Sequence, residues 1–133
     1  MAVFDTAFHH TPPTHASTYA IPKLWTWQYG IRRFGFHGIA HASLAENYAR
    51  HTHRSLKELR LITFQLGHGC SATAIDHGGF SVETSMGFSP LEGLVMGTRR
   101  VIWIRRDCVL SRREDPSFSL NDLSHQLNTQ LGY

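Results

Sequence analysis

Apolar residues recur along this chain with two periods, one of two residues and one of a helical turn, and together they predict a mixed α/β fold. An apolar run and two alternating segments around the turn Asp76–Gly79 predict strands, the last two forming a β-hairpin. These predicted strands are Leu59–Leu66, Cys70–Ile75 and Phe80–Thr84. Leu44, Tyr48 and several alanines at helical spacing predict a helix over Ala42–His51.

Shorter patterns divide the rest of the chain. Pro12 and Pro13 predict irregular structure over His9–Ala20, because proline breaks a helix interior. Ser55 is placed to cap a short turn that ends at Glu58. The other predicted elements are a strand end at Ala2–Phe4, a short helix packing aromatic side chains at Leu24–Tyr29, a turn and strand over Gly30–Gly38, a helical turn at Pro90–Met96 and a final helix over Ser119–Gln130.

Composition narrows the class of protein. The chain has 133 residues, 41% of them hydrophobic, which is enough to build a core and fits one domain or part of a larger one. Six of its thirteen Lys and Arg residues fall within 99–113, so the net charge of +3 reflects a local cluster and no nucleic-acid module. Two cysteines, no apolar run of membrane-spanning length and no signal peptide predict a cytoplasmic protein.

A Gly-x-Gly turn joins the first two predicted strands. Gly67 and Gly69 would let backbone N–H groups converge on an anion without obstruction from a Cβ atom, as a nucleotide phosphate requires. The same pair also fits an ordinary tight hairpin turn. Composition alone leaves both interpretations open.

Two further residues are candidates for chemistry. Asp5 follows an apolar segment, where a carboxylate can face a ligand cleft in an α/β protein; the alternative is an Asx-turn that caps a chain reversal. His37 follows Phe36 and precedes Gly38, and its imidazole could donate to a phosphoryl oxygen. The alternative is a packing histidine with satisfied hydrogen bonds.

Ten histidines raise the possibility of a metal site. His37 and His41 are four residues apart and His51 and His53 two apart, but no cysteine or acidic residue accompanies them at a zinc-like spacing. We therefore predict no dedicated metal site, and keep a histidine-rich metal-binding protein as an alternative.

Four segments, in this order, closely resemble the middle of an acetate kinase or of the related propionate kinases. They are Phe4–His9 (FDTAFH), Gly30–Gly38 (GIRRFGFHG), Leu61–Ser71 (LITFQLGHGCS) and Val82–Arg99 (VETSMGFSPLEGLVMGTR), with Tyr19–Pro22 (YAIP) matching as well. The resemblance covers about residues 2–99. It implies part of a ribonuclease-H-like, actin-like ATPase domain of the acetate and sugar kinase superfamily.

The same resemblance implies a reaction, ATP plus acetate giving acetyl phosphate and ADP with Mg²⁺. Phosphoryl transfer leaves the protein mostly positioning and charge stabilisation to supply. In the intact family the substrate is acetate or propionate and the enzyme is a homodimer, with no nucleic acid or membrane partner.

Residue roles follow from the matched motifs. Asp5 corresponds to the family's essential aspartate, and His37 and Arg99 to the histidine and arginine that stabilise the phosphoryl oxygens in the transition state. A guanidinium suits this task because it is planar, charged and forked. The residues matching the phosphate-binding loop are Gln65, Leu66, Gly67, His68 and Gly69, and those matching walls of the acetate methyl pocket are Phe36 and Pro90.

The chain departs from the family at two motifs. The family loop His-Leu-Gly-Asn-Gly is Gln-Leu-Gly-His-Gly here, which keeps both glycines but changes two side chains that contact the nucleotide. The family sequence after the catalytic histidine, Gly-Thr-Ser-His, is Gly38-Ile39-Ala40-His41, which loses two hydroxyls.

A larger departure follows Arg99. The family continues Ser-Gly-Asp-Leu-Asp-Pro-Ala, whereas this chain continues Arg-Val-Ile-Trp-Ile-Arg-Arg over 100–106. Codons TCG GGT GAT TTG GAT CCG GCG encode the family sequence and, read one base later, encode the sequence found. Our hypothesis is a one-base frameshift at Arg100, restored before Ser119. Genomic codons that cannot give the acidic turn in another frame would refute it.

These features divide the chain into a central acetate-kinase-like part (1–99), a divergent segment (100–118) and a family-like C-terminal helix (119–133). The family's N-terminal lobe and adenosine pocket have no counterpart here, so we predict a fragment without turnover by itself. A non-catalytic nucleotide-binding remnant and the product of a degraded gene remain alternatives.

Overall fold

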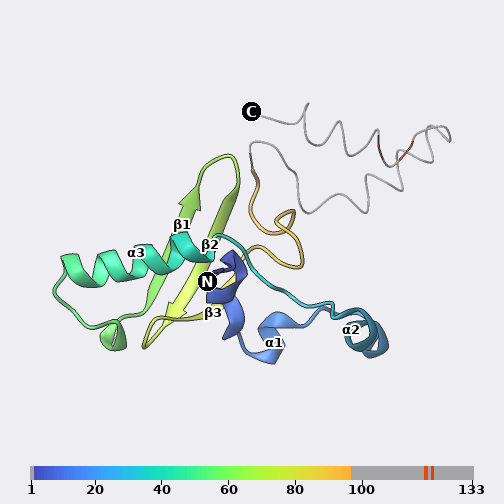
Figure 1. Ribbon diagram of the computed structural model, residues 1–133, viewed down its shortest axis with the longest axis horizontal. Coiled ribbons are helices and arrows are strands. Elements are labelled where there is room, and N and C mark those ends of the chain that lie inside the picture. Colours follow the sequence, from blue (N-terminus) through green and yellow to red (C-terminus); the bar gives the residue numbers. More distant parts are fainter. Residues whose placement is uncertain (1, 97–118, 120, 122–133) are drawn as a thin grey trace.

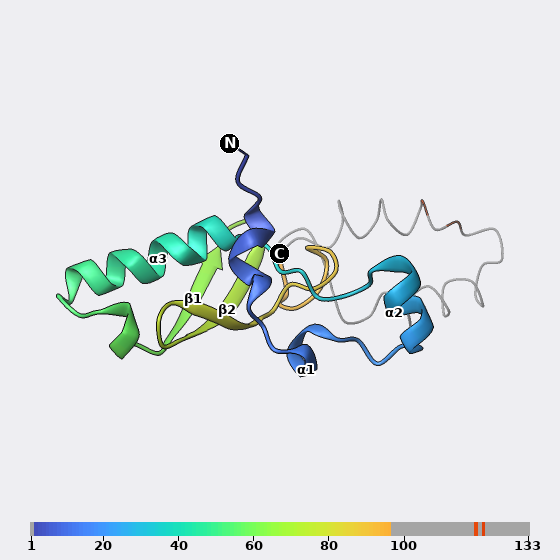
Figure 2. The same ribbon diagram turned by 60° about the horizontal axis from the view of Figure 1, so that its bottom comes forward.

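The computed structural model describes residues 2–96, 119 and 121. Their elements, in chain order, are η1 (Asp5–His10), α1 (Thr14–Ser17), α2 (Lys23–Tyr29), α3 (Gly38–His51), η2 (Leu56–Glu58), β1 (Leu61–Leu66), β2 (Cys70–Asp76) and β3 (Phe80–Thr84), where η denotes a 3-10 helix. The three strands form one antiparallel sheet in the order β1-β2-β3. Helix α3 lies across one face of this sheet, with η1 beside its first turn (Figures 1 and 2).

The predicted hairpin and main helix are confirmed. Strand β2 turns into β3 through Gly78 and Gly79, both at positive φ, which a two-glycine turn accommodates without strain. Helix α3 begins four residues before the predicted Ala42, and β1 begins two residues after the predicted Leu59. The Ser55 side chain accepts from the Lys57 amide and so caps η2 as predicted.

Four local predictions are wrong. Ala2–Phe4 is not a strand, and the described sheet offers it no partner. The segment predicted to be irregular contains helix α1, because Pro13 precedes the first helical residue, where its missing N–H does no harm. Of the predicted turn and strand over Gly30–Gly38, residues 30–37 form a non-repetitive loop and Gly38 begins helix α3, while Pro90–Met96 forms mostly turns and bends rather than a helical turn.

Helix α2 confirms the predicted helix but not the predicted packing. It projects away from the sheet on a loop (Figures 1 and 2). Trp25, Trp27 and Tyr29 are all exposed, Trp27 by 82%. The predicted final helix lies outside the described residues except for Ser119 and Asn121.

The inner face of the sheet is buried yet largely polar. Alternation along β2 points Ser71, Thr73 and Ile75 toward α3 and η1. The buried polar residues are His9, His41, Ser71, Thr73, Ser81 and Thr84, and the buried apolar residues are Ala45, Ala49, Leu59, Ile75, Met86 and Met96. Among the described residues, no helix combines the length and apolar character that crossing a bilayer takes.

Candidate functional site

Asp5 caps helix α3 from a distant part of the chain. One carboxylate oxygen accepts from the His37 backbone N–H at 2.5 Å, and the other accepts from the Ile39 N–H at 3.2 Å. These amides lie at the helix start, where N–H groups lack intrahelical partners and the helix dipole favours an anion. Asp5 therefore binds groups more than thirty residues away, rather than closing the local Asx-turn that was the alternative.

Gly38 allows η1 to approach the first turn of α3. A Cβ atom at Gly38 would overlap the Asp5 carbonyl oxygen and lie 2.8 Å from the Phe8 Cβ. Only glycine leaves room for this contact. The glycine after His37 is therefore part of the site, because it brings the aspartate to the helix start.

His37 reaches the Gly-x-Gly turn. Its backbone is left-handed, with φ 57° and ψ 26°, and its Nδ1 lies 2.8 Å from the Ser71 hydroxyl at the start of β2. A Cβ atom at Gly69 would lie 3.3 Å from the His37 Cε1 and 3.5 Å from Nε2. Gly69 thus makes room for the imidazole, and its φ is not positive. The structure brings Asp5, His37 and this turn together.

Within the turn itself, one backbone donor is already engaged. The Gly67 N–H donates to the Gly69 carbonyl at 3.1 Å, and the Cys70 thiol contacts the Gly67 carbonyl at 3.4 Å. Leu66, Gly67 and His68 are exposed, whereas Gln65 is partly buried. An anion bound here would meet this exposed turn.

A series of side-chain hydrogen bonds, fully buried at Ser71 and His41, begins at His37, and the sequence did not reveal it. Ser71 Oγ also lies 2.8 Å from the Nε2 of His41, and the Nδ1 of His41 lies 2.8 Å from Thr63 Oγ1. Burial, with smaller contributions from His9 and His37 nearby, lowers the pKa of His41 to about 4, so this imidazole is neutral. The i, i+4 spacing of His37 and His41 was the available signal.

His9 forms a second buried contact beneath the same loop. Its Nδ1 lies 2.9 Å from Ser81 Oγ and its Nε2 3.0 Å from the Phe36 carbonyl. Burial also lowers the pKa of His9. Gly35, at φ 75°, admits this ring, because a Cβ there would lie 2.6 Å from it.

The predicted pocket residues Phe36 and Pro90 lie on two loops that hydrogen bonds join. The Phe34 and Gly35 amides donate to the Gly87 carbonyl at 3.0 and 3.2 Å. The Phe34 and Phe88 rings pack with centroids 5.9 Å apart. The structure therefore places both loops side by side.

A partly buried cluster of hydrogen bonds holds the loop that carries Pro90. The Tyr19 hydroxyl contacts both Glu92 carboxylate oxygens at 2.5 and 2.6 Å and accepts from the Phe88 N–H at 2.7 Å. Burial, and then the hydrogen bond to Glu92, raises the pKa of Tyr19 to about 12. A Cβ at Gly87 would overlap both partners. No role for the Tyr19–Glu92 pair was predicted from the sequence.

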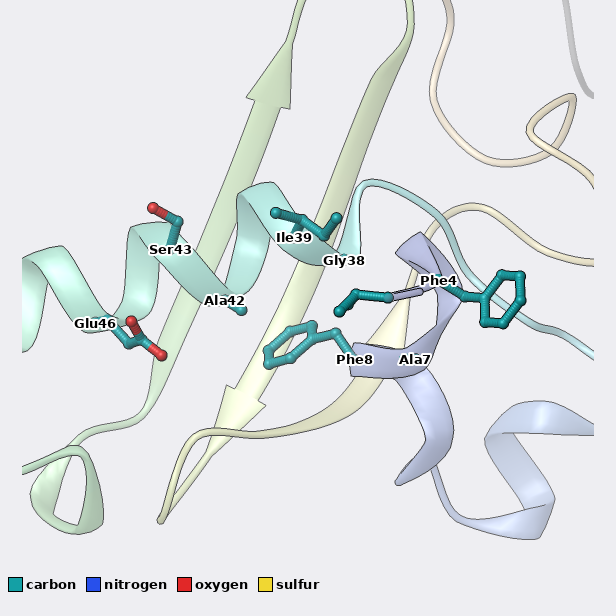
Figure 3. Close-up of a pocket in the computed structure, with 9 residues that line it drawn as sticks. Phe4, Ala7, Phe8, Gly38, Ile39, Ala42, Ser43 and Glu46 are labelled. Carbon is teal, nitrogen blue, oxygen red and sulfur yellow. The ribbon is translucent and has the colours of Figure 1, made fainter. Parts of the chain in front are cut away.

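A separate hollow of about 310 Å³ lies between η1 and α3 (Figure 3). Figure 3 shows Phe8 directed toward α3 and Ser43 and Glu46 farther along the helix. Neither Asp5 nor His37 lines it, and its walls are mainly apolar. This hollow is therefore distinct from the polar cluster around His37.

The described residues limit which groups could hold a metal. No group of three His, Cys, Asp or Glu side chains within residues 2–96 is arranged to bind one. His37 and His41 both direct a ring nitrogen at Ser71. Asp5 is the carboxylate beside His37, and one carboxylate with phosphate oxygens is a common way to hold Mg²⁺. Arg99 lies outside the described residues.

Comparison with known proteins gives a consistent result. The model of the acetokinase family matches residues 1–132. The acetate kinase of Halothermothrix orenii is 58% identical over 99 residues, 74% of this chain and 25% of the relative. That of Gloeobacter violaceus is 46% identical over 132 residues, 99% of this chain and 32% of the relative. The chain spans a quarter to a third of the length of these relatives.

Solved structures agree. An acetate kinase of Porphyromonas gingivalis superimposes with a TM-score of 0.87 at 32% identity, covering 98% of this chain and 32% of that one. A propionate kinase of Francisella tularensis superimposes with a TM-score of 0.83 at 39% identity, covering 98% of this chain and 33% of that one. The expected fold, part of an α/β ATPase-like domain, is confirmed.

Proposed function

Because the chain belongs to the acetokinase family, we propose that it carries one side of a site that transfers the γ-phosphoryl group of ATP to acetate or propionate. The observation that supports this most directly is the meeting of Asp5, His37 and the Gly67–Gly69 turn, which lie far apart in sequence. A donor, a carboxylate and an exposed glycine turn are what binding of a magnesium nucleotide requires.

His37 is the proposed donor to the phosphoryl oxygens. Its backbone is fixed by Asp5 and its ring by Ser71, so the imidazole is held in place before a ligand arrives. Preorganised donors of this kind typically contribute about 3–4 kcal/mol to a transition state. Arg99 is proposed as the second donor on the motif alone.

Asp5 has two proposed tasks. Its contacts to the amides of His37 and Ile39 orient the histidine, and its carboxylate is available as an oxygen ligand for Mg²⁺. When bound, the ion would neutralise phosphate charge. Both tasks need the ionised carboxylate.

Substrate selection is assigned to Phe36 and Pro90. An apolar wall of this size discriminates a methyl from an ethyl group by only about 1–3 kcal/mol. Acetate and propionate therefore both remain proposed substrates. A cytoplasmic location and a homodimer belong to the same proposal.

Nucleotide binding tests this proposal directly. Titration of the ¹⁵N-labelled chain with Mg²⁺ and ADP should give saturable shifts at the His37 ring and the Gly69 amide. His37→Ala should weaken binding about tenfold or more, as expected for a lost hydrogen bond to a charged group. His77→Ala, at an exposed histidine bonded to the Lys57 carbonyl, is the matched control. Absence of saturable shifts would refute the proposal.

Turnover is a separate question. Since the chain spans a quarter to a third of its relatives, we expect no acetyl phosphate from the 133-residue polypeptide by itself. Hydroxamate detection of acetyl phosphate above the blank would contradict this expectation. Nucleotide binding without turnover would also be the result for a non-catalytic remnant.

A further inference from the structure

We propose that Ser71 is a positioning residue that, together with His41 and Thr63, fixes the proton of neutral His37 on Nδ1 and leaves Nε2 as the nitrogen that faces a ligand. This inference rests on the proposed function for its consequence, but its geometry does not depend on any ligand. Ser71 and His41 are both completely buried, so water does not compete for their hydrogen bonds.

The direction of each hydrogen bond follows from Thr63, which lies at the end of this hydrogen-bond series away from His37. The Thr63 hydroxyl can donate to the Thr73 carbonyl, 3.4 Å away, which accepts only. With its proton used there, Thr63 Oγ1 accepts from the Nδ1–H of His41 at 2.8 Å. The buried, neutral His41 then has a bare Nε2.

The orientation of the Ser71 hydroxyl then determines which ring nitrogen of His37 carries hydrogen. A serine hydroxyl has one proton, and the bare Nε2 of His41, 2.8 Å away, takes it. Ser71 Oγ is then an acceptor toward the Nδ1 of His37, also at 2.8 Å, so that Nδ1 carries hydrogen. The Nε2 of neutral His37 therefore has a lone pair and no proton.

This arrangement has a chemical consequence at the proposed site. Nε2 faces Gly69, since a Cβ there would lie 3.5 Å from it. In this tautomer the neutral ring carries no hydrogen on Nε2 and so offers a phosphoryl oxygen no donor from that nitrogen. Ser71 thus disfavours the neutral tautomer that would donate from Nε2.

His9 provides an internal comparison of opposite sense. Its Nε2 lies 3.0 Å from the Phe36 carbonyl, which accepts only, so the proton of neutral His9 is on Nε2. Ser81 then donates to its Nδ1. Two buried serines of one sheet face therefore support opposite tautomers.

The ring nitrogens can be observed directly. Long-range ¹H–¹⁵N spectra of the full chain, without nucleotide and at a pH where histidines are neutral, distinguish protonated from bare nitrogens. We expect protonated Nδ1 for His37 and His41 and protonated Nε2 for His9. Protonated Nε2 at His37 in the unaltered chain would overturn the proposal.

Two variants separate positioning from packing. Ser71→Ala should shift His37 toward protonated Nε2, whereas Ser81→Ala, which removes the matched buried hydroxyl beneath His9, should leave His37 unchanged. Thr63→Val removes the acceptor of His41 without touching His37, and should also move the His37 proton to Nε2. A His37 spectrum unchanged by both Ser71→Ala and Thr63→Val would refute the proposal that Ser71, His41 and Thr63 set the His37 tautomer.

The nucleotide titration distinguishes a failure of the tautomer proposal from a failure of the proposed function. If the histidines show the expected tautomers but the spectra do not respond to Mg²⁺ and ADP, the proposed function is refuted and the tautomer proposal stands. If nucleotide binding is saturable but Nε2 of His37 is protonated in the free chain, the tautomer proposal is refuted and the proposed function stands.

Discussion

The two faces of the sheet reverse the usual distribution of polarity. The face against α3 and η1 buries Ser71, Thr73, Ser81 and Thr84, while Ile62, Phe64 and Leu66 on the outer face of β1 are 69%, 54% and 72% exposed. Buried hydroxyls are stable only when they are hydrogen bonded, and here they meet histidines and one another. The inner face thus holds site residues in place, while the outer face is an apolar surface of the described part of the chain.

The largest expected effect comes from disturbing the inner face at Gly35. Gly35→Ala would place a Cβ 2.6 Å from the His9 ring and 2.8 Å from Thr84 Cγ2 in a left-handed conformation, and should lower the free energy of unfolding by about 3 kcal/mol. Gly30→Ala, at φ 62° with no atom within 4 Å, is the control and should lose about 1 kcal/mol. Urea unfolding measures both; equal losses would contradict the packing argument.

The second largest expected effect is a loss of stability at acid pH, through the buried histidines of the inner face. The folded pKa of His41 is about 4 and its ordinary value is 6.5, so below pH 6.5 the unfolded chain binds a proton that the folded chain does not. Stability is therefore complete above pH 6.5 and falls as pH drops toward 4, by about 2 kcal/mol at pH 5. His9 acts in the same direction.

Urea midpoints at pH 8, 6 and 5 test this dependence. His41→Gln should flatten it, although it lowers stability at every pH because it disrupts buried hydrogen bonds. His51→Gln, at an exposed histidine of the same helix, is the control and should keep the slope. An equally steep slope in His41→Gln would contradict the assignment.

The loop beyond β3 should respond less. Tyr19→Phe removes the hydroxyl that joins Glu92 to the Phe88 amide, and should cost about 1.5 kcal/mol, the lower value for a hydrogen bond to a charged group. Tyr29→Phe, on exposed helix α2, is the control and should change little. Thermal unfolding compares the two, and similar melting temperatures would argue against this role of the hydrogen-bond cluster.

A substitution on the outer face of the sheet should have the smallest effect on stability. Phe64→Thr replaces an exposed aromatic residue with a β-branched one that also favours strands, and it exposes no core, so stability should change by at most about 0.5 kcal/mol. Because the substitution removes apolar surface from a strand at the edge of the sheet that the described residues form, it should also reduce self-association in sedimentation experiments. A large loss of stability would mean that this face is buried in solution.

Much of the fold followed from local signals. The alternation of β2 and β3, their two-glycine turn and the periodicity of α3 are short-range properties, and all three elements form as predicted. Errors occurred where partners decide the conformation. Helix α3 starts at Gly38 because Asp5 caps it from outside, and Ala2–Phe4 has no neighbouring strand among the described residues.

The sequence by itself determined the family resemblance, the hairpin and the candidates Asp5, His37 and the Gly67–Gly69 turn. Only the tertiary structure decided that Asp5 binds the His37 amide, and that Ser71 lies between two histidines. The physical reason is the distance along the sequence between the residues that interact. Strand alternation and helical periodicity are set by neighbours along the chain, whereas these hydrogen bonds join residues thirty or more positions apart and exist only once α3 has packed on the sheet.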